Sequence, residues 1–191
     1  MPPKPKFTKE QIIETALKIV AEKGVEALTA KELGKALNTS TTPIFTFFGT
    51  MQEVQEAVIN AAMRCFESYA HNADKTLPAF KQVGVQMISF AKNEPLLFQL
   101  IFMSKKGGVT PFDDHYAYLG GIADECLNAI QADYGLSAGD ADTLFKHVWI
   151  HTYGIAVLCA TGMCDFSQKQ ISEMLTQDFT AMMTLLKSKE Q

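Results

Sequence analysis

The sequence lacks the long apolar runs that membrane and exported proteins need. None of its segments approaches the roughly 18 to 20 consecutive apolar residues of a membrane-spanning helix, and the N-terminal stretch MPPKPKF has no apolar signal segment. With 47% hydrophobic and 20% charged residues, the 191-residue chain has the composition of an ordinary globular protein. We therefore expect a globular protein that stays in the cytoplasm.

The sequence also has few cysteines, and none of them forms a CxxC pair. They stand at Cys65, Cys126, Cys159 and Cys164, a spacing that suggests neither a zinc site nor a redox motif. We expect these side chains to be buried free thiols.

Motifs that carry catalysis are missing as well. The chain has no GxSxG, no P-loop and no GxGxxG run, and its acidic residues are scattered singly. His147 and His151 lie on one helical face, but Val148 stands where a zinc-peptidase motif has glutamate. Such a histidine pair more often lies at an interface or lines a pocket. We predict no metal, no cofactor and no enzymatic activity; a metal-assisted helical enzyme is one alternative.

The stretch 29–48, TAKELGKALNTSTTPIFTFF, is typical of two short helices joined by a tight turn. Thr29 and Glu32 have the S/T-x-x-E spacing of a capping box. Asn38 tolerates the left-handed conformation that a tight turn requires, and Pro43 suits the first turn of the second helix. Residues 40–42 offer hydroxyls that could cap this helix. The pattern predicts a helix-turn-helix.

The second helix and the turn before it carry small hydroxyls and aromatic rings, which suit phosphates, base edges and thymine methyl groups in a DNA major groove. The alternative is that the hydroxyls are only caps and the rings only core. The candidate DNA-binding residues here are Thr29, Thr39, Ser40, Thr41, Thr42, Phe45, Thr46 and Phe47.

Residues 11–59 resemble the N-terminal DNA-binding domain of the TetR family of transcriptional regulators. Four positions depart from the family pattern: Phe45 replaces a usual Tyr, Met51 replaces a usual Lys, and Asn38-Thr39 replaces Gly-Val. These departures affect individual DNA contacts rather than the fold. The matching residues are Ile12, Ala16, Leu17, Gly24, Thr29, Leu33, Ser40, Ile44 and Phe48, and Phe45 matches only as an aromatic ring.

The net charge of −4 is unevenly divided along the chain. Residues 1–50 hold 7 lysines and 5 glutamates, whereas the remainder holds 10 basic and 16 acidic residues. Because attraction to phosphate is local, a mildly basic head is compatible with DNA binding. Lys4 and Lys6, in the proline-rich tail, could contact a phosphate or the minor groove, or belong to a disordered leader.

The rest of the chain reads as helix throughout, with no strand alternation. Capping pairs predict helix starts at Thr8, Thr50, Ser137 and Ser167, and Pro78 and Pro95 predict two more. The expected ranges are 8–24, 50–70, from 78, from 95, 112–134, 137–160 and 167–187, with an exposed loop at 104–111. The resemblance implies an all-α architecture of nine helices, with a DNA-binding domain at 1–49 and an effector-binding and dimerisation domain at 50–191.

The last two helices carry wide apolar faces, which suggest a partner. TetR-like proteins dimerise through these two helices, so the resemblance implies a homodimer that binds a palindromic operator. The candidate interface residues are Leu144, Val148, Ile155, Leu158, Ile171, Leu175, Phe179 and Met182.

The second half is rich in aromatic and sulfur-containing side chains, which could line an apolar pocket or simply form core. We favour a pocket, because the resemblance implies an effector-binding domain. The candidate effector-binding residues are Phe90, Phe98, Phe102, Met103, Tyr116, Trp149, His151 and Tyr153.

These observations lead to one functional hypothesis and one alternative. The hypothesis is a DNA-binding transcriptional regulator, a repressor that a small hydrophobic or amphipathic ligand releases from its operator. Displacement of the long fourth helix would couple the two events. The alternative is a helical ligand-binding or adaptor protein that does not bind DNA.

Overall fold

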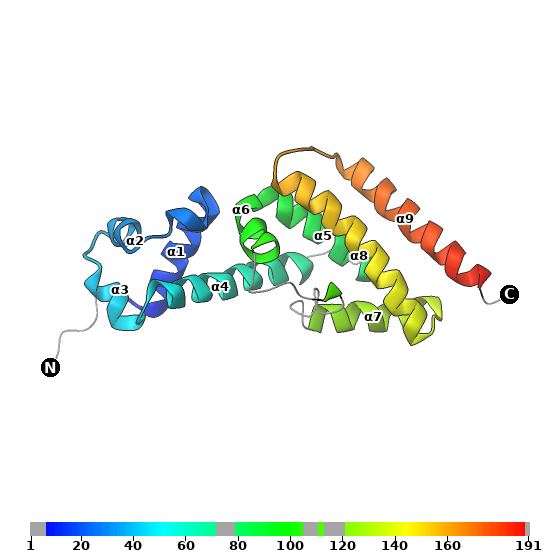
Figure 1. Cartoon of the computed structure of the whole chain (residues 1–191), viewed down its shortest axis with the longest axis horizontal. Helices are drawn as coiled ribbons and strands as arrows, with labels where there is room; N and C mark the ends of the chain where they lie inside the picture. Colours follow the sequence, from blue (N-terminus) through cyan, green and yellow to red (C-terminus); the bar gives the residue numbers. More distant parts are fainter. Residues whose placement is uncertain (1–6, 72–78, 105–110, 113–120, 190–191) are drawn as a thin grey trace. The chain divides into compact units, whose positions relative to one another are not determined.

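The computed structural model describes residues 7–71, 79–104, 111–112 and 121–189 (Figure 1). These residues form nine α-helices and no strand, which confirms the predicted all-α class. No helix in these ranges is long and apolar enough to span a bilayer. The helices are α1 (Lys9–Lys23), α2 (Ala30–Ala36), α3 (Thr42–Phe47), α4 (Met51–His71), α5 (Ala79–Asn93), α6 (Pro95–Phe98), α7 (Gly121–Tyr134), α8 (Ala138–Ala160) and α9 (Gln168–Ser188), with a 3₁₀ turn η1 (Val25–Ala27) and a π-helical turn η2 (Gln99–Met103).

The chain divides into two compact units. Unit 1 comprises the N-terminal segment to Ser68 together with Asn93–Ser104, and unit 2 comprises Tyr69–Lys92 together with Lys105–Gln191. The chain therefore passes between the units three times, once inside the continuous helix α4. The functional division at residue 49/50 stays a prediction.

Unit 1 begins with the capping box predicted for α1. The Thr8 hydroxyl accepts the Gln11 N–H at 3.2 Å, and the Gln11 side chain accepts the Thr8 N–H at 2.9 Å. The helix ends at Gly24, whose φ of 83° favours glycine. Both ends of α1 are therefore fixed by local sequence, as predicted.

The core of unit 1 joins α1–α4 to a later segment of the chain. Helix α6 packs against α1, and in η2 the Phe102 ring lies 5.1 Å from that of Phe66 and 4.8 Å from that of Phe98. Phe98 and Phe102, both predicted to bind an effector, are core residues of this unit. The other large buried side chains are Ile12, Ile19, Val20, Leu28, Leu33, Ile44, Phe48, Val54, Val58, Leu97, Leu100 and Ile101.

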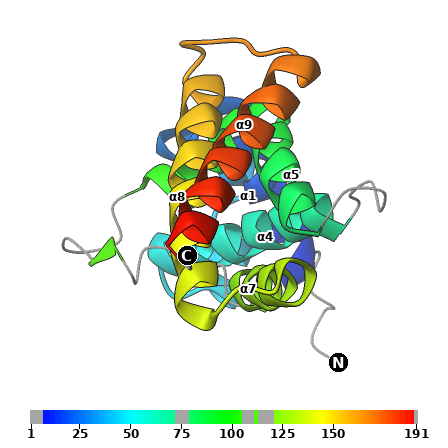
Figure 2. The same cartoon turned by 90° about the vertical axis from the view of Figure 1, so that its right-hand side faces the viewer.

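Unit 2 contains α5, α7, α8 and α9. The Ser137 and Ser167 hydroxyls cap α8 and α9, as predicted. Figure 2 shows α8 and α9 side by side, in direct contact. The Lys92 Nζ at the end of α5 contacts Asp165 Oδ1 at 2.8 Å and donates to the Phe166 carbonyl at 2.7 Å. This lysine therefore ties the loop between α8 and α9 to α5.

Two helix predictions need correction. The predicted sixth helix remains α-helical only to Phe98 and then widens into the π-helical turn. The start predicted for the seventh helix at Phe112 is wrong, because Phe112 is not α-helical and the described helix begins at Gly121. Residues 113–120 and most of the predicted loop 104–111 lie outside the described residues.

Candidate functional sites

The turn between α2 and α3 is closed by backbone hydrogen bonds. Asn38 adopts the predicted left-handed conformation, with φ 51°. Its N–H donates to the Lys35 carbonyl at 3.0 Å, and the Thr39 N–H donates to the Gly34 carbonyl at 2.9 Å. This pair of bonds is a Schellman motif, which satisfies the last carbonyls of α2. The turn therefore fixes where the chain enters α3.

Gly34 allows the chain to close tightly at this turn, a role that the sequence pattern alone did not reveal. A Cβ at Gly34 would lie 3.1 Å from the Thr39 carbonyl oxygen, closer than side chains normally approach backbone. The sequence feature that could have indicated this role is a glycine inside a short predicted helix, because such a glycine often marks a close packing contact.

Helix α3 is held mainly by two apolar side chains. Ile44 is fully buried and Phe48 is 3% exposed, and the Lys9 Nζ lies 5.1 Å from the centre of the Phe48 ring. Thr41 precedes the helix but makes no side-chain capping bond, so the capping predicted for this end is absent at that residue. Hydrophobic anchoring, rather than capping, positions this short helix.

Thr42, Phe45 and Thr46 form an exposed surface on α3, which we call the α3 surface. Phe45 is 45% exposed, unusual for a phenylalanine. The Thr46 hydroxyl donates to the Thr42 carbonyl at 3.0 Å, so its oxygen can still accept a bond. Of the other candidates, Ser40 is exposed, and Thr39, Thr41 and Phe47 are half-buried.

Thr29 acts as a helix cap, but the predicted reciprocal bond is absent. Its hydroxyl accepts the Glu32 N–H at 3.2 Å. The Glu32 carboxylate instead pairs with the Lys23 Nζ at 2.7 Å. This hydrogen bond, with the accompanying charge attraction, raises the pKa of Lys23 and lowers the pKa of Glu32. The negative charge of Glu32, near the N-terminus of α2, is therefore balanced by Lys23.

Two further cations lie next to the turn. Lys31 and Lys35 are exposed on α2 and form no ion pair in the described part of the chain. Lys4 and Lys6, the tail lysines considered for phosphate contact, lie outside the described residues. The sequence analysis did not single out Lys31 and Lys35, because their exposure depends on which face of α2 packs against the rest of unit 1.

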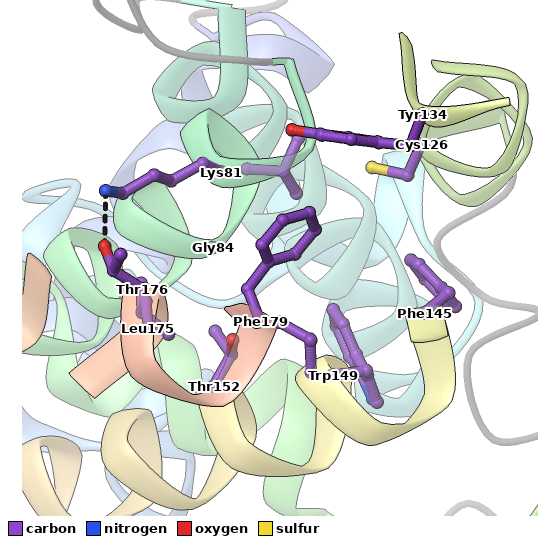
Figure 3. Close-up of a pocket in the computed structure, with 12 residues that line it drawn as sticks. Lys81, Gly84, Cys126, Tyr134, Phe145, Trp149, Thr152, Leu175, Thr176 and Phe179 are labelled. Carbon is purple, nitrogen blue, oxygen red and sulfur yellow. Dashed lines mark hydrogen bonds between the residues drawn. The ribbon is translucent and has the colours of Figure 1, made fainter. Parts of the chain in front are cut away.

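A cavity of about 220 Å³ lies within unit 2 (Figure 3). Helices α5, α7, α8 and α9 each contribute to its wall, and its lining is largely apolar. Trp149 is the single predicted effector-binding residue among those that line it. The lining residues are Lys81, Val83, Gly84, Cys126, Tyr134, Phe145, Val148, Trp149, Thr152, Leu175, Thr176 and Phe179.

Two titratable groups of the cavity wall, Cys126 and Tyr134, are uncharged around neutral pH. Burial raises the pKa of Cys126 to about 12, with a further contribution from the Glu125 charge. Burial and the Asp133 charge also raise the pKa of Tyr134. Lys81 is the cation of the lining, and its Nζ donates to the Thr176 hydroxyl at 2.8 Å.

The other predicted effector residues do not line this cavity. Phe90 is buried, with its ring 5.3 Å from that of Tyr69, and Met103 is 40% exposed in unit 1. His151 and Tyr153 lie half-buried on α8. Tyr116 lies outside the described residues.

Most predicted dimer residues are covered by the chain itself. Leu158, Phe179 and Met182 are half-buried. The apolar side chain of α8 that does face outward is Ile150, which is 54% exposed, and the exposed Leu185 lies on α9. The fully buried members of the predicted set are Leu144, Val148, Ile155, Ile171 and Leu175.

The two histidines on α8 do not belong to a metal site in the described residues. Those residues contain no cluster of three or more His, Cys, Asp or Glu side chains that could hold an ion. His147 is exposed, and the buried Nε2 atom of His151 has no hydrogen-bond partner in the described part of the chain.

Residues 12–58 match the family model described as bacterial regulatory proteins, tetR family. This match covers α1 to α3 and the beginning of α4, the segment that contains the Schellman turn and the α3 surface. No curated protein sequence matches the chain significantly.

Solved structures share the fold over nearly the whole chain. BioQ bound to its double-stranded DNA operator is 17% identical, with a TM-score of 0.61, over 94% of this chain and 99% of its own. A Vibrio parahaemolyticus protein assigned to the TetR family is 13% identical, with a TM-score of 0.63, over 91% and 97%. An Acinetobacter baumannii TetR variant in complex with minocycline is 14% identical, with a TM-score of 0.57, over 97% and 99%. The segment 12–58 therefore matches the TetR family model, and the chain as a whole shares the fold of these solved structures.

Proposed function

We propose that the protein is a homodimeric repressor that binds a palindromic operator and leaves it when a small molecule binds unit 2. The observation that carries the proposal is the α3 surface, presented on a short helix by a closed turn. Such a helix enters the major groove in helix-turn-helix proteins. BioQ, which shares the fold, is seen with its operator, and the TetR variant is seen with minocycline.

Within this proposal the side chains of unit 1 divide into two roles. Thr42, Phe45 and Thr46 contact base edges and thymine methyl groups, since hydroxyl and apolar groups suit those edges. Lys31 and Lys35 contact phosphates, which adds affinity without sequence preference. Phe45 has no hydroxyl for phosphate, so it acts through apolar contact.

Replacing Thr42 with alanine is expected to weaken operator binding by about 1–3 kcal/mol while leaving binding to unrelated DNA nearly unchanged. The side chain is exposed, so stability should change by less than about 0.5 kcal/mol. Fluorescence anisotropy with operator and scrambled duplexes at one salt concentration measures both affinities. Equal losses on both duplexes would assign Thr42 to a phosphate contact.

Lys31→Met provides the complementary variant. It should weaken operator and scrambled DNA to the same extent and reduce the slope of log affinity against log salt by about 1. An unchanged salt slope would place Lys31 outside the DNA interface.

The dimer contact proposed here centres on a stripe of α8 made by His147, Ile150, Gly154 and Leu158. Their spacing of three and four residues places them on one helix face, and Ile150 is well exposed. Gly154 lies in the middle of this helix, where glycine costs roughly 1 kcal/mol. Apart from its chain neighbours and the backbone of its own helix, no described atom lies within 4 Å of where its Cβ would be, so no contact among the described residues requires glycine here. Close approach of the same helix from a second copy would account for it.

The ligand acts in this proposal by changing the separation of the two DNA-binding heads. Helix α4 begins directly after the head and continues without interruption into unit 2, so a displacement of α4 would reach the head. To empty the operator substantially, the ligand must favour the released state by a few kcal/mol.

The sign of regulation is tested by transcription in vitro from a promoter that contains the selected operator. Adding the protein should reduce the transcript, and adding the ligand should restore it. A transcript that rises on addition of the protein would identify an activator instead.

A further inference from the structure

We propose that the unit 2 cavity binds a small, flat aromatic carboxylate. The inference deepens the proposed function, because it names the ligand class and the site of the proposed repressor, and it rests on that function for its regulatory meaning. Ligand binding itself can be tested without DNA. Four features of the cavity carry the argument: its size, its aromatic walls, a buried donor and a cation.

The size of the cavity limits the ligand to a small molecule. An apolar protein cavity of roughly 150 Å³ accommodates one benzene ring. The cavity here is about 220 Å³, which leaves room for a second fused ring but not for a large polycyclic compound. The apolar part of the ligand is therefore about the size of naphthalene.

The cavity walls favour a flat ring over a branched aliphatic group. The rings of Phe145 and Trp149 lie nearly parallel, at 19° and 6.1 Å between centres. Tyr134 and Phe179 form a second pair, at 5.0 Å and 55° (Figure 3). Aromatic rings gain from offset stacking and edge-to-face contact with such walls. The protonated thiol of Cys126 adds to this uncharged lining.

Trp149 supplies a hydrogen-bond donor that the chain itself does not use. This residue is 5% exposed, and its indole Nε1 is buried without an acceptor in the part of the chain that the structure describes. Buried N–H groups normally have a partner, because leaving one unpaired is unfavourable. A ligand oxygen in the cavity would provide the acceptor.

Lys81 adds a cation to the cavity wall, which favours an anionic ligand such as a carboxylate. Its Nζ donates to the neutral Thr176 hydroxyl, and no acidic residue pairs with it among the described side chains (Figure 3). Thr176 is exposed, which places this end of the cavity near solvent. A carboxylate bound there keeps partial hydration and gains a charge-assisted hydrogen bond. The anion therefore sits at the rim and the rings lie inside.

The test is isothermal titration calorimetry with 2-naphthoate and its uncharged analogue 2-naphthamide. The wild-type protein should bind 2-naphthoate saturably with one site per chain, and bind 2-naphthamide about tenfold or more weakly, because a charge-assisted bond is lost. Absence of saturable 2-naphthoate binding up to its solubility limit would overturn the proposal.

Two variants assign the binding to this cavity. Lys81→Met keeps the stem of the side chain and removes its charge, so it should weaken 2-naphthoate about tenfold and leave 2-naphthamide unchanged. Trp149→Phe keeps an aromatic ring but shortens the stacking wall, and should weaken both compounds about three- to tenfold. The matched control is Lys169→Met, at an exposed lysine of α9 that does not line the cavity. Equal affinities in Lys81→Met and wild-type protein would contradict the proposal, even if Trp149→Phe fails to fold.

Operator binding separates this proposal from the proposed function. If 2-naphthoate binds in the Lys81-dependent way but does not reduce operator affinity, the cavity assignment holds and ligand-controlled release fails. If another compound releases the operator equally well from wild-type and Lys81→Met protein, release holds and the cavity assignment fails.

Discussion

Replacing Ile150 with glutamate is expected to convert the proposed dimer into monomers and to reduce operator affinity by at least about 100-fold. Ile150 is 54% exposed in one chain, at the centre of the α8 stripe. In a twofold dimer the substitution places two unpaired carboxylates in one interface, where burying charge is strongly unfavourable. Two linked heads bind far more tightly than one, commonly by 10² to 10⁴. The DNA effect therefore follows from loss of the second head.

Size-exclusion chromatography with light scattering measures the first effect, and operator binding measures the second. Ala132→Glu is the matched control, because it adds the same charge at an exposed position of α7. The control should remain dimeric and bind the operator normally. If the Ile150→Glu protein is still dimeric, the dimer interface does not lie on the α8 stripe.

Replacing Ile44 with alanine is expected to lower the free energy of unfolding by about 2–5 kcal/mol and to abolish specific DNA binding. Ile44 is fully buried and is one of two apolar anchors of the six-residue helix α3. So short a helix is not stable by itself, so its position depends on packing. Losing this anchor removes the α3 surface from its fixed place beside the turn.

The neighbouring residue provides the control. Phe45→Ala changes a 45% exposed side chain, so stability should change by less than about 0.5 kcal/mol, while operator affinity should fall by about 1–3 kcal/mol. Urea denaturation and anisotropy separate the two quantities. If Phe45→Ala destabilises the protein as much as Ile44→Ala does, Phe45 belongs to the core and its role in DNA contact fails.

Local sequence was sufficient to predict several helix ends and the turn of the N-terminal part of unit 1. The Thr8 capping box, the Gly24 stop and the left-handed Asn38 each depend on residues within a few positions of one another. Such patterns can be read directly from the chain. One exception is Glu32. Its carboxylate was expected to accept the Thr29 backbone N–H, but it pairs with Lys23, nine residues away in the sequence. This ion pair depends on how α1 and α2 pack together, so a local capping pattern cannot predict it.

The sequence alone did not determine which face of α8 is buried in unit 2. The helix is apolar over most of its circumference, so the buried Val148 and the exposed Ile150 are equally plausible interface residues until the packing is known. For the same reason Phe98 and Phe102 resembled pocket residues, although Phe102 packs on Phe66 and Phe98 packs on Phe102 in unit 1. The cavity requires four helices to meet, and no single segment carries that information.

The central claim, sequence-specific recognition of DNA by a dimer, is tested most directly by selecting genomic fragments with the purified protein at near-physiological salt. The account predicts enrichment of a palindromic site whose half-sites lie about one helical turn, roughly 34 Å, or somewhat more apart, and loss of that enrichment with Ile44→Ala. The selection is repeated after the protein has been unfolded and refolded to remove bound small molecules. No enrichment above background in either form would contradict the account and favour a helical ligand-binding protein that does not bind DNA.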